Sequence, residues 1–211
     1  MQSTDRLLPI LTGQPVIPVV AVESAEEGVS LARALAAGGL PAIEVTLRTP
    51  AALDAIAAIV AEVPEAICGA GTILNPSQYE AAVKAGSKFI VSPGATVELL
   101  DAAQESEVPF LPGSATPSEL LAMMQEGYEV LKFFPAEQSG GLAYLKSLAP
   151  VFQSLKFCPT GGVSPDNAKD YLSLPNVVCV GGSWVAPKAL IKDGRWDEIT
   201  ALASEAARLK G

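Results

Sequence analysis

The sequence predicts an α/β protein built as one (β/α)8 barrel of the TIM type, a single domain that spans residues 1–211. Short apolar, β-branched runs alternate with Ala-, Leu- and Glu-rich stretches from end to end, and eight such pairs can be counted. No linker, low-complexity tract or charge run divides the chain. Eight strand–helix units with short connections favour a closed barrel, and a doubly wound open sheet is the alternative.

Each expected element has its own local signal. Apolar runs predict strands near residues 16–22, 41–47, 66–71, 88–92, 108–112, 129–134, 155–159 and 177–181. Helical stretches fill the gaps near residues 24–38, 50–62, 76–85, 96–105, 117–126, 140–149, 165–172 and 196–209. Proline is favoured in the first turn of a helix, and glycine is favoured just after its last residue. Both residue types occur at the expected helix boundaries. The prolines are Pro50, Pro76, Pro117 and Pro165, and the glycines are Gly38, Gly39, Gly86 and Gly127.

The composition excludes several classes of function. The 14 basic and 23 acidic residues give a formal net charge of −9, which disfavours nucleic acid and anionic membranes as partners. Histidine is absent and no Cys or carboxylate cluster has metal-ligand spacing, so we expect no metal site and no cofactor. A Ser-His-Asp or Cys-His mechanism is excluded for the same reason. Acid–base work is left to carboxylates, lysine or tyrosine.

The chain also lacks the signals of export. No run approaches ~18 consecutive apolar residues, and the first residues lack a basic region followed by an apolar one, so we expect a soluble, cytoplasmic protein. Cys68, Cys158 and Cys179 lie in separate strand-like runs. We expect buried thiols rather than a disulfide framework, with a reactive nucleophile as the alternative.

A lysine, Lys132, stands inside an apolar strand. Because side chains alternate along a strand, Lys132 shares one face with Val130 and Phe134, whereas Leu131 and Phe133 take the other. Burial penalises an ammonium group, so we expect this lysine to give up its proton and act as a nucleophilic amine. The alternative is a lysine that reaches solvent from the strand end or pairs with a carboxylate.

The second expected strand carries a matching set of polar residues. Glu44, Thr46 and Arg48 share one face, and the aliphatic residues between them take the face toward the helices. In a barrel, Glu44 and Arg48 would then point into the mouth at the carboxyl ends of the strands, where such enzymes do their chemistry. Glu44 and Lys132 would form an acid–base and nucleophile pair. The alternative is a structural ion pair of Glu44 with Arg48 or Lys132.

Three strand ends are rich in glycine. Thr72 follows Gly69-Ala70-Gly71, where a small hydroxyl suits one oxygen of a carboxylate ligand. Thr160-Gly161-Gly162 and Gly181-Gly182-Ser183 follow the last two expected strands. Many barrels bind phosphate at these two places through backbone N–H groups. Amide dipoles can therefore hold an anion although the protein is acidic.

These motifs together resemble the 2-keto-3-deoxy-6-phosphogluconate (KDPG) aldolases, also called KHG/KDPG aldolases, where KHG is 4-hydroxy-2-oxoglutarate. The resemblance runs in order over nearly the whole chain, through Glu44–Thr49, Gly69–Thr72, Lys132–Glu137, Pro159–Gly162 and Gly181–Trp184. It implies a class I aldolase, independent of metal and assembled as a homotrimer, that cleaves KDPG to pyruvate and glyceraldehyde 3-phosphate. It leaves open the preference between KDPG and KHG and between C4 epimers. At Ser114 an aliphatic residue is more usual in the family.

The resemblance also implies a role for each candidate residue. Lys132 would form the Schiff base, Glu44 would transfer protons, and Arg48 and Thr72 would hold the pyruvyl carboxylate. The expected lining of the rest of the substrate site is Thr160, Gly161, Gly162, Gly182, Ser183, Phe134 and Pro93. Two rivals remain: a sugar-phosphate isomerase or epimerase in which Lys132 acts only by its charge, and a sugar-phosphate sensor without catalysis.

Overall fold

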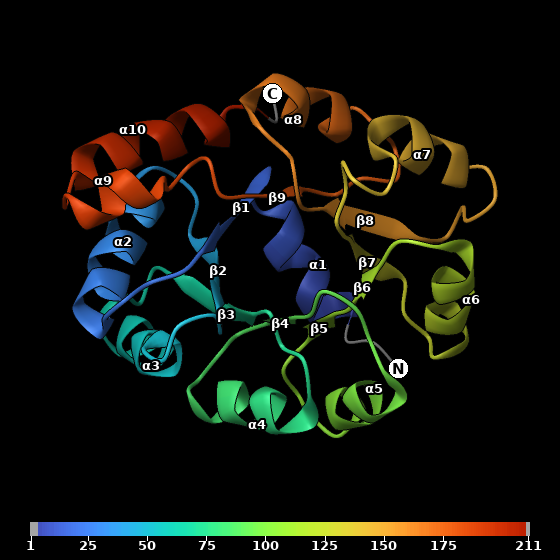
Figure 1. The fold of residues 1–211 in the computed structure, drawn as a ribbon, viewed down its shortest axis with the longest axis horizontal. Helices are drawn as coiled ribbons and strands as arrows, with labels where there is room; N and C mark the ends of the chain where they lie inside the picture. The colour runs from blue at the N-terminus through green and yellow to red at the C-terminus, as the bar shows by residue number, and fades with distance from the viewer. Residues whose placement is uncertain (1–3, 210–211) are drawn as a thin grey trace.

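The computed structural model describes residues 4–209 and has an α/β fold, with parallel strands that curl at the centre and helices that surround them (Figure 1). The strands are β1 (Val16–Val20), β2 (Ala42–Thr46), β3 (Ile67–Gly71), β4 (Ile90–Val91), β5 (Phe110–Leu111), β6 (Gly113–Ser114), β7 (Val130–Phe133), β8 (Lys156–Pro159) and β9 (Val180–Gly182). The helices are α1 (Thr4–Thr12), α2 (Ala25–Ala37), α3 (Ala52–Glu62), α4 (Pro76–Lys84), α5 (Val97–Gln104), α6 (Pro117–Gln125), α7 (Gly141–Leu148), α8 (Pro165–Leu172), α9 (Lys188–Lys192) and α10 (Trp196–Ala207).

All the strand pairs are parallel, and neighbours in the sheet are mostly neighbours in the chain. One sheet has the order β5-β4-β3-β2-β1-β9, and a second has the order β6-β7-β8. Two isolated parallel bridges, Phe157 to Val177 and Thr160 to Gly181, link β8 and the residue after it to the β9 segment. The carboxyl ends of the strands therefore gather at one edge of the curved surface, where ligands of parallel sheets usually bind.

Side chains divide between the two faces of the strands as the alternation predicts. Ile43, Val45, Leu131 and Phe133 belong to the large apolar cluster that the helices share. A smaller cluster on the inner face contains Val130 and other apolar strand residues. Its other members from the strands, and from the residues just before them, are Ile17, Ala42, Phe89, Val91, Leu111, Cys158 and Cys179. The predicted face assignments of β2 and β7 are confirmed.

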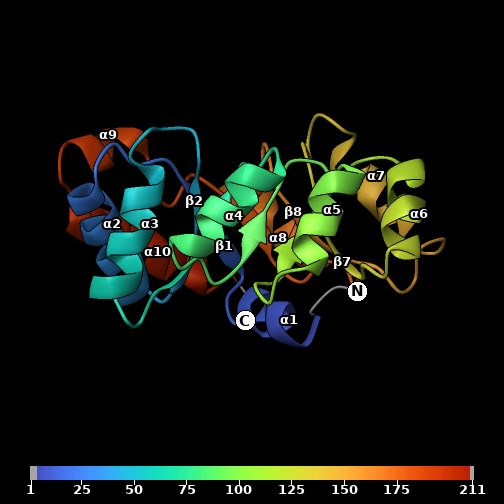
Figure 2. The ribbon, with the colours of Figure 1, turned by 90° about the horizontal axis from the view of Figure 1, so that it is seen from below.

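Helix α1 was not predicted, and it lies against the amino ends of the strands. Figure 2 shows it below the strand layer, apart from the other helices. Leu7 and Leu11, one helical turn apart, are fully buried and belong to the inner cluster. The spacing of these two leucines indicates a helix, but the sequence gives no clear prediction because Pro9 lies within the segment and disfavours a helix.

Two other differences have local causes. The expected strand at 108–112 ends at Leu111 because Pro112 has no N–H for the ladder, and pairing resumes at Gly113 as β6. Helix α9 has only 5 residues, too few for a periodic signal. The predicted boundary signals mostly hold: Pro76, Pro117 and Pro165 begin helices, whereas Pro50 precedes α3 by two residues. Gly39, Gly86 and Gly127 follow helices with φ of 89°, 91° and 79°.

The cysteines are buried, and no disulfide joins them. Burial raises the pKa of the Cys68 thiol to about 12, so this thiol stays protonated near neutral pH. A protonated thiol is a poor nucleophile, which argues against a reactive role for Cys68. Among residues 4–209, no helix has the length and apolar character needed to cross a membrane.

One buried side chain, Gln14, joins the first two strands. Its Nε2 donates to the carbonyls of Val16 at 2.7 Å and Ala42 at 2.8 Å, and its Oε1 accepts from the Ala42 N–H at 2.7 Å. Gln14 is 3% exposed, so water cannot replace these bonds. The Ala42 N–H and C=O at the start of β2 are thus satisfied by a side chain, whereas the other edge of β2 pairs with β3.

We predict that Gln14→Leu lowers the free energy of unfolding by about 3 kcal/mol, because it leaves buried N–H and C=O groups without partners. Urea unfolding measures this. Gln125→Leu, at an exposed position on α6, should change it by less than about 0.5 kcal/mol. Equal small losses in both variants would contradict the role assigned to Gln14.

Candidate functional site

Lys132 and Glu44 come from β7 and β2, 88 residues apart, and their side chains meet on the inner face. The Lys132 Nζ lies 3.2 Å from Oε1 and 3.5 Å from Oε2 of Glu44. Lys132 is 5% exposed and Glu44 3% exposed, so the alternative of a lysine that reaches solvent is wrong. A proton can pass directly between the two groups and leave a neutral amine. The contact is also the buried ion pair that the structural alternative predicts.

Phe134 and Pro93 lie close to Lys132. The Lys132 Nζ is 5.3 Å from the centroid of the Phe134 ring. Lys132 pairs with Gly113 of β6, and a Cβ at Gly113 would lie 2.3 Å from the carbonyl carbon and oxygen of Pro93. The Pro93 backbone therefore packs against the strand beside Lys132. Phe134 directly follows β7, one residue beyond the structure's end of that strand, and Pro93 follows β4.

Arg48 does not pair with Glu44. Its Nε donates to the Thr46 hydroxyl at 2.9 Å, and that hydroxyl donates to the Val20 carbonyl of β1 at 2.8 Å. The buried Thr46 hydroxyl thus links the Arg48 Nε to β1. The sequence assigned no role to Thr46, although its place between two inner-face polar residues was a usable signal. Arg48 itself is exposed, with its charge at the rim of the site.

Thr72 has a strained backbone. Its φ is 61°, and among the residues that the structure describes it is the one non-glycine residue with a positive φ. This conformation is rare for a β-branched residue and costs on the order of 1–3 kcal/mol. Strain of this size is usually kept where it serves a ligand. Thr72 directly follows β3, and Arg48 follows β2, the strand paired with it.

The second glycine-rich region follows β8 and ends β9. Thr160 is buried, and its hydroxyl lies where a Cβ at Gly181 would come within 2.2 Å. Gly161 and Gly162 have φ of 99° and 80°, a conformation that glycine adopts without strain. Ser183 is exposed just beyond β9. Thr160 and Gly181 form a parallel bridge, so the segments that follow β8 and end β9 are neighbours.

Packing explains why residue 182 is a glycine, and the sequence alone did not show this. A Cβ at this position would lie 1.8 Å from the Trp184 ring, so the ring occupies the space of the missing side chain. Gly182 is not among the glycines with positive φ. Its substitution would disturb Trp184 first, and it is a poor probe of ligand binding.

Two further residues, Glu137 and Tyr171, support the Gly161–Gly162 loop. The Tyr171 hydroxyl donates to Glu137 Oε1, and the Glu137 N–H donates to the Gly161 carbonyl at 3.0 Å. Burial and this hydrogen bond raise the pKa of Tyr171, so the hydroxyl stays a donor. The sequence showed Glu137 only as part of a motif, and nothing in it linked Tyr171 to that loop.

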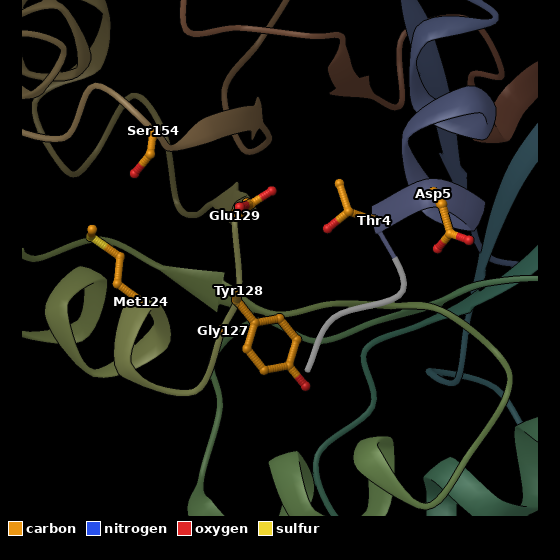
Figure 3. Close-up of a pocket in the computed structure, with 7 residues that line it drawn as sticks. All are labelled: Thr4, Asp5, Met124, Gly127, Tyr128, Glu129 and Ser154. Carbon is orange, nitrogen blue, oxygen red and sulfur yellow. The ribbon is translucent and has the colours of Figure 1, made fainter.

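A separate hollow of about 400 Å³ lies near the amino ends of the strands, away from this edge. Figure 3 shows its lining, which comes from α1, from α6 and from the segments just before β7 and β8. The lining residues are Thr4, Asp5, Met124, Gly127, Tyr128, Glu129 and Ser154. None of the predicted site residues is among them. Within the described part of the chain, no group of three or more Cys, Asp or Glu residues could hold a metal ion.

The match to known proteins is extensive. The family model for KDPG and KHG aldolase matches residues 8–202. The KHG/KDPG aldolase of Escherichia coli (strain K12) is 52% identical over 197 residues, which cover 93% of this chain and 92% of the relative. The chain belongs to the KDPG and KHG aldolase family. Another member, the 2-dehydro-3-deoxy-phosphogluconate aldolase of Dickeya dadantii, is 49% identical over 197 residues, with the same coverage of both chains.

Solved structures of family members have the same fold. The KDPG aldolase of Legionella pneumophila, with pyruvate captured at low pH as a covalent carbinolamine intermediate, has a TM-score of 0.93 and 46% identity. The match covers 95% of this chain and 97% of that one. The 2-keto-3-deoxy-6-phosphogluconate aldolase of Zymomonas mobilis with 3-phosphoglycerate has a TM-score of 0.90 and 45% identity, with 97% of each chain covered.

Substitution of Thr72 should weaken substrate binding but leave the stability of the fold nearly unchanged. Thr72→Gly removes both the hydroxyl and the strained Cβ, so the free energy of unfolding should change by less than about 1 kcal/mol. If the hydroxyl contacts a substrate carboxylate, its loss should raise KM for KDPG by about 10-fold or more. Steady-state kinetics and urea unfolding measure the two effects.

Thr72→Ser is the matched variant, because it keeps the hydroxyl. Its KM should stay within about 3-fold of the unmodified protein. A KM that rises equally in both variants would show that the hydroxyl makes no such contact.

Proposed function

We propose that this protein is a class I aldolase that cleaves KDPG to pyruvate and glyceraldehyde 3-phosphate through a Schiff base on Lys132, with KHG, cleaved to pyruvate and glyoxylate, as a second substrate. The observation that carries the proposal is the buried contact between Lys132 and Glu44 at 3.2 Å. A nucleophilic amine and a proton-transferring carboxylate are the two groups that this chemistry needs. The carbinolamine in the Legionella pneumophila relative supports it.

We further infer that the strands form a complete (β/α)8 barrel in a single domain. β5 and β6 would act as one strand interrupted at Pro112. The pairing of β9 with β1 and the bridges between β8 and the β9 segment support closure. A doubly wound open sheet would not pair its last strand with its first in this way.

Schiff-base formation begins with a neutral Lys132. Glu44 accepts the proton of the ammonium group, and the free amine adds to the C2 carbonyl of the substrate to give a carbinolamine. Glu44 then returns that proton to the carbinolamine hydroxyl, which leaves as water, so a cationic iminium and a free Glu44 carboxylate remain. The positive nitrogen can accept the electron pair of the C3–C4 bond, which the ketone could not do as readily.

Cleavage requires removal of the proton from the C4 hydroxyl. Glu44, directly or through a water molecule, takes that proton as the C3–C4 bond breaks, and the aldehyde leaves. The bond pair remains as an enamine on C3. Protonation of C3 with the help of Glu44, followed by hydrolysis of the iminium, releases pyruvate and restores Lys132. One carboxylate thus acts first as base and then as acid.

The other predicted residues would bind the two ends of the substrate. Arg48, fixed to Thr46, and Thr72 would hold the pyruvyl carboxylate on the side of β2 and β3. Thr160, Gly161, Gly162, Gly182 and Ser183 would line the phosphate end, with Phe134 and Pro93 beside the reacting lysine. The 3-phosphoglycerate bound to the Zymomonas mobilis relative supports an anion site of this kind. Backbone N–H groups supply the attraction without adding positive charge.

We also propose a homotrimer that works in the cytoplasm. Some large apolar side chains are exposed in the single chain, and a trimer would be able to bury them. Those in the described residues are Leu74, Val97, Leu121, Met124 and Val151. Buried thiols without disulfides are usual in a reducing compartment.

The Schiff base predicts that pyruvate plus borohydride inactivates the protein irreversibly, because borohydride reduces the iminium to a stable amine. Peptide mass spectrometry should place the added mass on Lys132. Lys132→Met should abolish labelling. Lys156→Met, which removes a more exposed lysine from the neighbouring strand β8, should leave it intact.

Labelling on another lysine would contradict the proposed role of Lys132. Turnover without any adduct would favour an isomerase or epimerase, and binding of pyruvate without turnover would favour a sensor.

The phosphate site predicts a change in substrate preference when Gly162 is replaced. Gly162→Ala forces a Cβ into a backbone with φ of 80° and to within 2.6 Å of Glu137 Cγ, so the loop must shift. The ratio of kcat/KM for KDPG to kcat/KM for KHG should fall by about 10-fold, because KHG has no phosphate.

Gly39→Ala is the control, since Gly39 has a similar φ of 89° at the end of α2, with its nearest contact at 3.4 Å. It should leave the ratio unchanged. A proportional loss with both substrates in Gly162→Ala would remove the support for a phosphate site at this loop.

A further inference from the structure

We propose that Gly71 is the residue that positions the Glu44 carboxylate, because it leaves open the space on β3 that the carboxylate occupies. The inference rests on the proposed function, in which Glu44 transfers the protons. Gly71 would act through Glu44 and would not touch the substrate itself. It is therefore a positioning residue for the reaction.

The contact between the two residues is very close. In the register of β2 and β3, Glu44 lies opposite Gly69, and its side chain extends along β3 toward Gly71. A Cβ at Gly71 would lie 2.1 Å from Oε1, 2.5 Å from Cγ and 2.6 Å from Cδ of Glu44. These distances are below 3.0 Å, a separation that real Cβ contacts essentially never show. The outer part of Glu44 would have to move if Gly71 carried a methyl group.

The backbone itself does not require glycine at this position. Gly71 is absent from the glycines with positive φ, so an alanine would fit its conformation. Glu44 atoms are the three nearest neighbours of the missing side chain. The space above Gly71 therefore serves Glu44 rather than the turn that follows β3.

This packing matters because little else holds the carboxylate. Among the described residues, Lys132 is the hydrogen-bonding partner of Glu44, through both carboxylate oxygens. In the proposed reaction, Lys132 Nζ becomes bonded to C2 of the substrate and loses hydrogens that it could donate. The carboxylate must keep its place through these steps. Its close packing over Gly71 restricts its position and does not depend on the hydrogen bonds from Lys132.

Gly69 provides a matched comparison on the same strand. It lies two residues before Gly71, on the same face, and a Cβ there would come within 2.5 Å of the Phe89 ring. Gly69→Ala thus introduces an equal methyl group that collides with the core and not with Glu44.

The test is a kinetic double-mutant cycle with KDPG as substrate. Glu44→Gln should lower kcat by roughly 10²- to 10⁴-fold, the usual scale for loss of an acid–base group. Gly71→Ala should lower kcat by at least about 10-fold with a smaller change in KM. In the Glu44→Gln background, however, Gly71→Ala should cost less than about 2-fold, because the group that it displaces is already inactive. Gly69→Ala should change kcat by the same factor in both backgrounds.

Thermal unfolding gives a second cycle that does not depend on catalysis. Gly71→Ala should lower Tm by about 5 °C when Glu44 is present. In the Glu44→Ala background the same change should lower Tm by less than about 2 °C, since the colliding atoms are gone. If Gly71→Ala alone is too unstable to purify, Glu44→Ala with Gly71→Ala should still fold as well as Glu44→Ala.

The outcomes separate this inference from the proposed function. Near-normal kcat in Glu44→Gln would overturn both, because Glu44 would not be the acid–base group. A low kcat in Glu44→Gln together with a normal kcat in Gly71→Ala would overturn only the positioning role of Gly71. Equal losses from Gly71→Ala with and without the Glu44 side chain, in kcat or in Tm, would do the same.

Discussion

The contact between Lys132 and Glu44 is the constraint on which the rest of the site depends. Two ionisable groups that are 5% and 3% exposed lose their hydration, and each is tolerated because the other lies within hydrogen-bonding distance. Strand β7 of one sheet and strand β2 of the other must therefore face one another across the interior. The apolar clusters on both faces hold the two strands in place, and the proposed chemistry transfers a proton between the two groups.

Polar side chains on the inner face lie where neighbouring strands have no side chain. The Glu44 carboxylate lies over Gly71, and the Thr160 hydroxyl lies over Gly181. Gly113 similarly admits the backbone of Pro93 beside Lys132. The strand-end glycines thus have two uses. Gly161 and Gly162 allow a loop conformation with positive φ, whereas Gly71, Gly113 and Gly181 provide room.

The sequence predicted most of the strands and helices because alternation and helix-end signals are local. It also predicted that Glu44 and Lys132 face inward, since parity along a strand follows from the chain alone. It could not predict α1, whose short apolar pattern acquires meaning only when it closes the end of a curved sheet. It also could not predict the Thr46 link to Arg48 or the contact of Tyr171 with Glu137, because such contacts depend on which strands and loops become neighbours. The packing of Trp184 over Gly182 escaped it for the same reason.

Helix α1 has a consequence for the order of events in the proposed reaction. Leu7 and Leu11 fill the interior at the amino ends of the strands, and the proposed substrate site lies at the opposite rim, where molecules would enter and leave. The aldehyde fragment is not covalently attached once the carbon–carbon bond has broken, whereas the three-carbon fragment is still attached to the lysine. The hydrolytic water must arrive through the same opening that the aldehyde leaves. Product release is then sequential, with the aldehyde departing first and the keto acid second.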